Sequence, residues 1–112
     1  AILKRRSEPD LREQCLSFIN QRYAENVALQ DLAALLNVNP NYLSGFIHRA
    51  TGKTFRILLN EKRVREAETY LRLHKGLSVT EIAGLCGFRD GNYFSTVFKK
   101  VTGVTPREYR EK

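Results

Sequence analysis

Apolar residues recur three and four positions apart along most of this chain, the spacing that places them on one face of an α-helix. The first such stripe follows Ser7 and Pro9, residue types that favour the start of a helix. We therefore expect an amphipathic helix there, with its apolar face packed against a later part of the chain. The apolar positions of this helix are Leu11, Cys15, Phe18, Ile19 and, at its end, Tyr23.

A short helix, a tight turn and a second helix are predicted between residues 29 and 52. Asn37 and Val38 form the turn, Asn39 is a favourable N-cap, and a proline follows as the first helical residue. Gly52 ends the second helix. The inward face comprises Leu29, Leu32, Ala33 and Leu36, then Tyr42, Leu43, Phe46, Ile47 and Ala50. The outward face of the second helix is polar and short-chained, with Asn41, Ser44, Gly45, His48 and, beside them, Arg49.

A long helix is predicted after Thr54, over residues 55–73. At 1.5 Å per residue its roughly 19 residues extend about 28 Å. Its charged positions alternate in sign, which is typical of a solvated face with pairs four residues apart. Its apolar seam is Phe55, Leu58, Leu59, Ala67, Tyr70 and Leu71.

The pattern of residues 29–52 returns in residues 79–103. The inward positions of the short helix repeat after 50 residues, whereas Asp90 follows its counterpart Asn39 after 51, so the second turn has gained one residue. Ser78 and Glu81 predict a capping box, and Thr105 with Glu108 predicts another at a short last helix. The inward face is Val79, Ile82, Ala83 and Cys86, then Tyr93, Phe94, Val97, Phe98 and Val101; the outward face is Asn92, Ser95, Thr96 and Lys99, with Lys100 beside them.

The charge of the chain points to a polyanionic partner. Nineteen Lys and Arg residues against 12 Asp and Glu give a net charge of +7, and the pI is about 9.7. Long apolar runs that could span a membrane are absent from the sequence, and Cys15 and Cys86 fall in apolar helical patterns, as expected of reduced core residues of a cytoplasmic protein. The isolated His48 and His74 offer no metal or catalytic cluster, so we expect neither an enzyme nor a cofactor.

Two copies of a helix, a tight turn and a polar-faced second helix in a basic chain indicate paired helix-turn-helix motifs. Short polar side chains on the first turns of each second helix suit the edges of DNA bases, and cations one or two turns later suit phosphates. Small polar residues also simply solvate exposed helices. Solvation alone would explain a polar face on one helix, but two helices with matching polar faces favour the interpretation that they bind DNA.

Residues 29–110 resemble the DNA-binding domain of AraC/XylS-family bacterial transcription regulators. The matching motifs are L-x-x-L-A-x-x-L, Y-L-S and A-T-G in the first half, R-x-x-x-A-x-x-Y-L from Arg63 to Leu71, and then SVTEIAGLCGF, YFSTVFKKVTG and TPREYR. The resemblance implies an all-α fold of seven helices: a tail or linker at 1–8, a first helix-turn-helix subdomain at 9–53, a linker helix at 54–74 and a second subdomain at 75–112. It also implies a structural role for Arg63, which would brace the subdomains; the alternative is a contact of Arg63 with DNA.

The family's mode of action implies that two recognition helices, about 39–51 and 90–102, enter successive major grooves of double-stranded DNA. Contact with RNA polymerase is also implied, as is an effector that acts only through a domain not present in this chain. Carried over by position, the DNA-binding residues are Asn41, Ser44, Gly45, His48, Arg49, Gly91, Asn92, Ser95, Thr96, Lys99 and Lys100.

The first half departs more from the family pattern. The family commonly has Arg at the positions of Gly45 and Thr96, Lys at that of His48, and a capping Ser at that of Ala28. We therefore expect the second subdomain to dominate DNA affinity. The alternative is a helical protein-interaction module that contacts RNA polymerase or another regulator.

Overall fold

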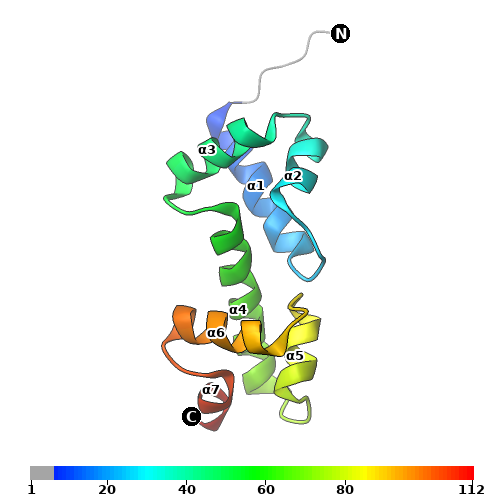
Figure 1. Ribbon diagram of the computed structural model, residues 1–112, viewed down its shortest axis with the longest axis vertical. Helices are drawn as coiled ribbons and strands as arrows, with labels where there is room; N and C mark the ends of the chain where they lie inside the picture. The colour runs from blue at the N-terminus through cyan, green and yellow to red at the C-terminus, as the bar shows by residue number, and fades with distance from the viewer. Residues whose placement is uncertain (1–6) are drawn as a thin grey trace. The chain divides into compact units, whose positions relative to one another are not determined.

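The structure, a computed structural model, describes residues 7–112, so the predicted basic tail with Lys4, Arg5 and Arg6 lies outside the described residues. Seven α-helices follow one another in these residues, and no strand occurs among them (Figure 1). The all-α prediction is therefore confirmed. The helices are α1 (Glu8–Arg22), α2 (Leu29–Leu36), α3 (Pro40–Thr51), α4 (Phe55–Leu73), α5 (Val79–Leu85), α6 (Gly91–Thr102) and α7 (Pro106–Glu111).

The contacts divide the chain into two compact units. Among the described residues, unit 1 contains 7–22 together with Val27–Leu58, and unit 2 contains Tyr23–Asn26 together with Leu59–Lys112. The boundary between them thus falls inside α4, within the segment predicted as a linker helix. Each unit contains one helix pair of the predicted repeat, α2 with α3 and α5 with α6.

Unit 1 buries the apolar stripe of its first helix as expected. Leu11, Cys15, Phe18 and Ile19 are all buried, and the ring of Phe18 lies 6.3 Å from that of Phe55 between centroids. The start of α2 lacks a side-chain cap at Ala28, but the Asp31 carboxylate accepts a hydrogen bond of 2.7 Å from the Ala28 N–H. An acidic residue in the first turn therefore satisfies one backbone donor that the missing cap side chain could not.

Unit 2 is built on one continuous hydrophobic cluster from α4, α5 and α6. The predicted inward residues Ile82, Ala83, Phe94 and Phe98 are buried at its centre. Val64 of α4 is fully buried as well, although the predicted seam of that helix omitted it. Two helix pairs with the same inward pattern thus make a core in each unit.

The two turns of the repeat match closely in their backbone. The N–H of Val38 donates to the Ala33 carbonyl at 3.0 Å, and that of Phe88 donates to the Ala83 carbonyl at 2.9 Å, 50 residues later. The residue preceding each of these donors has a positive φ, 57° at Asn37 and 96° at Gly87. The residue added in the second turn is therefore Arg89, between this shared turn and the N-cap.

Gly87 is surrounded by other parts of unit 2. A Cβ placed on it would lie 2.6 Å from the Tyr23 carbonyl oxygen and 2.9 Å from Nε of Arg63. That arginine donates from Nε to the Tyr23 carbonyl at 2.7 Å and from Nη2 to the Glu25 carbonyl at 2.9 Å, and its guanidinium lies 5.6 Å from the centre of the Phe88 ring. Arg63 thus holds residues 23–26 against α4 and the α5–α6 turn.

Three residues that were predicted to face the core are exposed. Tyr42 is 51% exposed and Tyr93 is 40% exposed, and Ala50 is exposed too. Both tyrosines lie at the edge of an apolar stripe, where the ring contacts a neighbouring phenylalanine, Phe46 or Phe88. A tyrosine at such an edge keeps its hydroxyl in a polar environment, as amphipathic aromatic side chains do.

Candidate nucleic-acid interface

The starts of α3 and α6 are built by the same cap geometry. The side-chain oxygen of Asn39 accepts hydrogen bonds from the N–H groups of Asn41 and Tyr42 at 2.8 and 3.4 Å. The Asp90 carboxylate accepts from Asn92 and Tyr93 at the same two distances. The predicted caps are therefore confirmed, and they fix the first turn of each candidate recognition helix.

The ends of the two helices also match. Thr51 and Thr102 each donate a side-chain hydrogen bond to the carbonyl four residues earlier, at 2.7 and 2.8 Å. Gly52 and Gly103 follow with φ of 75° and 88°, a left-handed conformation that favours glycine. Each candidate recognition helix therefore has defined limits, and both are 12 residues long.

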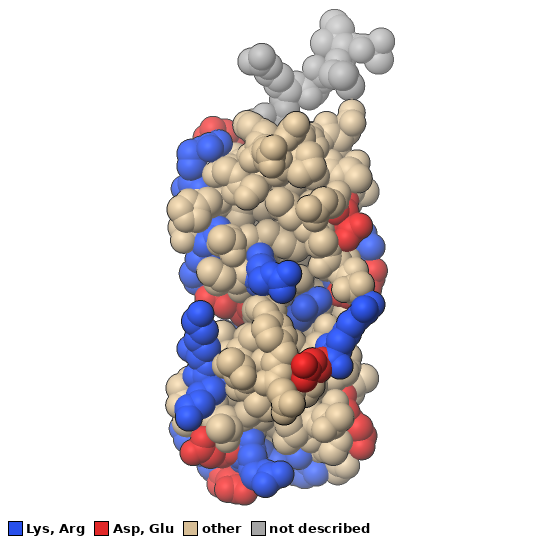
Figure 2. Space-filling view, viewed as in Figure 1, with Lys and Arg blue, Asp and Glu red and all other residues tan. Residues whose placement is uncertain are grey.

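The predicted contact residues lie on the outer faces of these helices. Figure 2 shows mainly uncharged surface over α3 in unit 1 and over α6 in unit 2. Gly45 and Ser95 are half-buried, and the other predicted residues are exposed. The exposed ones are Asn41, Ser44, His48 and Arg49 on α3, and Gly91, Asn92, Thr96, Lys99 and Lys100 on α6.

This arrangement places hydrogen-bonding groups and cations at different heights along each helix. Amide and hydroxyl groups lie in the first two turns, whereas His48, Arg49, Lys99 and Lys100 lie in the last turns. In α6 the Thr96 hydroxyl donates to the Asn92 carbonyl at 3.0 Å, which fixes its rotamer and leaves its oxygen as an acceptor. Chemically, each face combines groups that can read base edges with charges that can bind phosphates.

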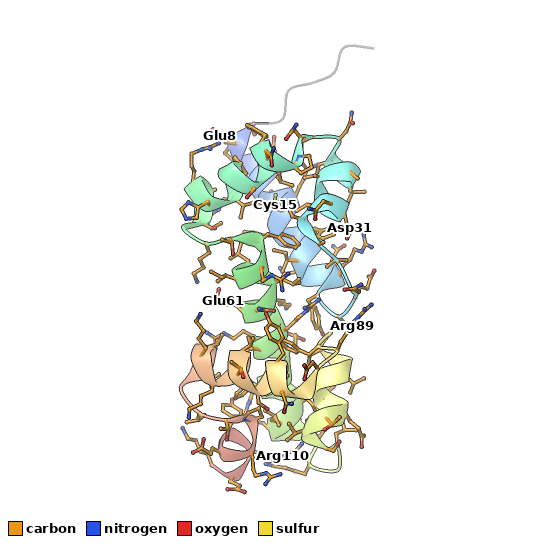
Figure 3. The ribbon with its side chains drawn as sticks, viewed as in Figure 1. Glu8, Cys15, Asp31, Glu61, Arg89 and Arg110 are labelled. Carbon is orange, nitrogen blue, oxygen red and sulfur yellow. The ribbon has the colours of Figure 1, made fainter. Side chains whose placement is uncertain are left out.

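Two features at the start of α6 were not predicted from the sequence. Arg89 is exposed immediately before the Asp90 cap, and it is the residue added in this turn (Figure 3). Tyr93 accepts a hydrogen bond of 3.0 Å from the Asn60 amide of α4, which positions its exposed ring beside the N-terminal turn. The turn of the second repeat is one residue longer than that of the first, and this difference in the sequence could have identified Arg89.

The titratable groups with shifted pKa lie away from these faces. Burial raises the pKa of Cys86 to about 12 and also raises the pKa of Cys15; both thiols are free and buried, as predicted. Burial, together with the neighbouring Glu66 carboxylate, raises the pKa of Tyr23 to about 12. Hydrogen bonds from the Thr105 N–H and hydroxyl lower the pKa of Glu108, the partner residue in the cap of α7. These groups thus belong to cores and caps.

Metal-binding and membrane-spanning features are not found in the described part of the chain. Residues 7–112 contain no group of three or more His, Cys, Asp or Glu side chains that could hold a metal ion. None of the seven helices combines the length and the apolar character needed to cross a bilayer.

A family model described as a helix-turn-helix domain matches residues 32–112. Among curated proteins, the transcriptional activator RhaR of Cronobacter sakazakii is 40% identical over 83 residues, which cover 74% of this chain and 29% of that protein. The chain spans about a third or less of the length of the curated relatives it matches.

Solved structures show the same fold. The C-terminal domain of AraT, a response regulator from Geobacillus stearothermophilus, superposes with a TM-score of 0.85 at 34% identity, covering 90% of this chain and 84% of that one. The DNA-binding domain of AdpA, solved in complex with a target DNA, gives a TM-score of 0.82 at 25% identity and covers 88% of each chain. Together with the matched helix-turn-helix pairs, these similarities show that the chain belongs to the AraC family of transcription regulators, as its DNA-binding domain.

Proposed function

We propose that this chain binds double-stranded DNA sequence-specifically and thereby regulates transcription, with α3 and α6 as its recognition helices. The proposal rests mainly on one observation. Both helices have the same N-cap geometry, the same polar outer face and the same glycine stop, and the chain that carries them has a net charge of +7. A polar face on one helix needs no partner. Two faces built alike, with cations in the last turn of each, have the chemistry of a nucleic-acid interface.

The proposed division of labour follows from chemistry. Asn41, Ser44, Asn92, Ser95 and Thr96 read base edges in the major groove, because their amide and hydroxyl groups donate and accept hydrogen bonds. Gly91, where a Cβ would meet nothing within 4 Å, allows close approach of the helix backbone. His48, Arg49, Lys99 and Lys100 hold phosphates, which supply affinity without sequence information.

Selection from a random duplex pool, followed by titration, tests the proposal. The selected duplex should bind about 10³-fold or more tightly than a scrambled duplex of the same composition. Its affinity should also fall by orders of magnitude between about 50 and 200 mM salt, because phosphate contacts release counterions. Equal affinity for selected and scrambled duplexes would contradict sequence-specific binding.

Contact with RNA polymerase is a second candidate function, supported by a separate observation. Leu35 of α2 and Leu85 of α5 lie 50 residues apart at matched positions, and they are 64% and 47% exposed. These leucines belong neither to the buried cores nor to the polar faces of α3 and α6. An apolar protein contact through either leucine would be nearly independent of salt, and replacement of both leucines by serine would weaken it while leaving DNA affinity unchanged.

A further inference from the structure

Arg49 occupies space on α3 that a side chain at position 45 would otherwise fill. A Cβ placed on Gly45 would lie 3.1 Å from Nη1 of Arg49, closer than most such contacts allow. Helical side chains lean toward the N-terminus of their helix, so a residue covers the turn that precedes it. The absence of a side chain at Gly45 therefore gives the Arg49 guanidinium room to lie against the helix one turn nearer its start.

This fold-back changes what Arg49 can reach. Its Cα lies in the last turn of α3, but its Nη1 lies beside Gly45, one turn nearer the start of the helix and next to Ser44 in the chain. The N-terminal turns of a recognition helix are those that contact base edges. Because α3 contains no acidic residue, no carboxylate on the helix itself competes for the guanidinium.

The second recognition helix lacks this arrangement. Thr96 and Lys100 hold the equivalent positions 51 residues later, and the threonine side chain already occupies the surface that Gly45 leaves open. The ammonium group of Lys100 also lacks the planar set of N–H donors that a guanidinium has. A guanidinium can donate two parallel hydrogen bonds to O6 and N7 of guanine, which a single ammonium matches less selectively.

We propose that Arg49, folded back over Gly45, reads a guanine in the half-site bound by α3, and that Gly45 is a positioning residue for it. The proposal rests on the DNA-binding function proposed above. It assigns Arg49 a specificity role in place of a phosphate contact alone. It also predicts that the two half-sites differ: the α3 half-site contains a guanine whose recognition depends on Arg49, and the α6 half-site has no equivalent read by Lys100.

The test compares base preferences of the wild type and three variants on the duplex selected by the wild type. The α3 half-site is the one whose preferences change in Asn41→Ala. Within it, replacing one guanine should cost the wild type about 5- to 150-fold in affinity, the range of a good bidentate contact. Arg49→Lys keeps the charge but should lose most of that preference, with the other positions unchanged.

Gly45→Ala gives an independent readout, because it leaves Arg49 itself intact. The new methyl group should shift the guanidinium away from the helix and weaken the same guanine preference, while circular dichroism shows an unchanged helix content. Lys100→Ala is the matched control and should weaken all duplexes by a similar factor. Substitution of 7-deazaguanine at the critical position removes the N7 acceptor, and it should weaken the wild type but not Arg49→Lys.

The outcomes separate this proposal from the one on which it rests. If the wild type prefers no duplex, both fail. If the wild type is specific but Arg49→Lys and Gly45→Ala retain its full base profile, or weaken every duplex equally, then Arg49 is a phosphate contact and only the assignment of the guanine to Arg49 is overturned.

Discussion

At Gly87 the backbone turns with φ of 96°, and atoms from other parts of unit 2 lie where a side chain would begin. The closest is the Tyr23 carbonyl oxygen, which also accepts the hydrogen bond from Nε of Arg63. The sequence motif indicated a bracing role for Arg63, and the structure shows its contacts with Tyr23 and Glu25 inside unit 2. The sequence alone could not reveal the contact of Gly87 with Tyr23, because the two residues are 64 positions apart and meet only after folding.

Gly87→Ala should therefore destabilise the protein strongly. The left-handed backbone costs a non-glycine residue about 1–2 kcal/mol, and the contact with a backbone oxygen adds to that, so we expect a loss of about 2–4 kcal/mol in the free energy of unfolding. The matched control is Gly84→Ala in α5, where a Cβ meets nothing within 4 Å and should stabilise by about 0.5–1 kcal/mol. Urea denaturation of both variants measures the difference, and equal stabilities would refute this explanation.

At the scale of single helices, the caps could be predicted from sequence because each depends on residues within three positions of one another. Asn39, Asp90 and Thr105 all accept the expected hydrogen bonds. Thr105 and Glu108 form both bonds of their box, at 2.9 and 3.1 Å, whereas the bond found at the start of α5 is from the Glu81 N–H to Ser78. The exposure of Tyr42 and Tyr93 was not predictable in the same way, because helical spacing does not separate the edge of an apolar stripe from its centre.

Ala28→Ser tests the weakest cap. The N-cap residue already has extended backbone angles, φ −129° and ψ 168°, so a serine hydroxyl there can accept from the Asp31 N–H and complete the box that Asp31 begins. We expect a gain of about 0.5–1 kcal/mol in the free energy of unfolding. Ala34→Ser, exposed within the same helix, should instead cost about 0.5 kcal/mol. Thermal denaturation of the two variants in parallel measures both changes. A gain in the free energy of unfolding at both positions would contradict a capping effect.

For the whole molecule, the family resemblance implied the total of seven helices, and sequence repetition predicted the two helix pairs and their two polar faces, because the same spacing occurs twice. It could not predict the fold-back of Arg49 over Gly45, which depends on a side-chain conformation. The two faces also differ in their basic residues: α6 has two lysines in its last turn, Lys99 and Lys100, whereas α3 has Arg49 beside a histidine. The α6 face should consequently supply more of the affinity, and the α3 face a distinct base preference.

The difference in basic residues between the α3 and α6 faces predicts which variants lose more DNA affinity. Asn92→Ala and Lys99→Ala should weaken binding to the selected duplex more than Asn41→Ala and His48→Ala, by about threefold or more for each pair. Fluorescence anisotropy at fixed salt provides the four dissociation constants. The reverse order would show that α3 is the main source of affinity.

DNA binding by the outer faces of α3 and α6 is tested most directly by adding one negative charge at either of two threonines. Thr96 on α6 and Thr69 on α4 are both exposed, and each donates its hydroxyl hydrogen to the carbonyl four residues earlier. Thr96→Glu places a carboxylate against the phosphates and should weaken binding to the selected duplex about 100-fold. Thr69→Glu makes the same change in net charge elsewhere and should weaken it by no more than about threefold. Equal dissociation constants for the two variants would contradict DNA binding by these faces.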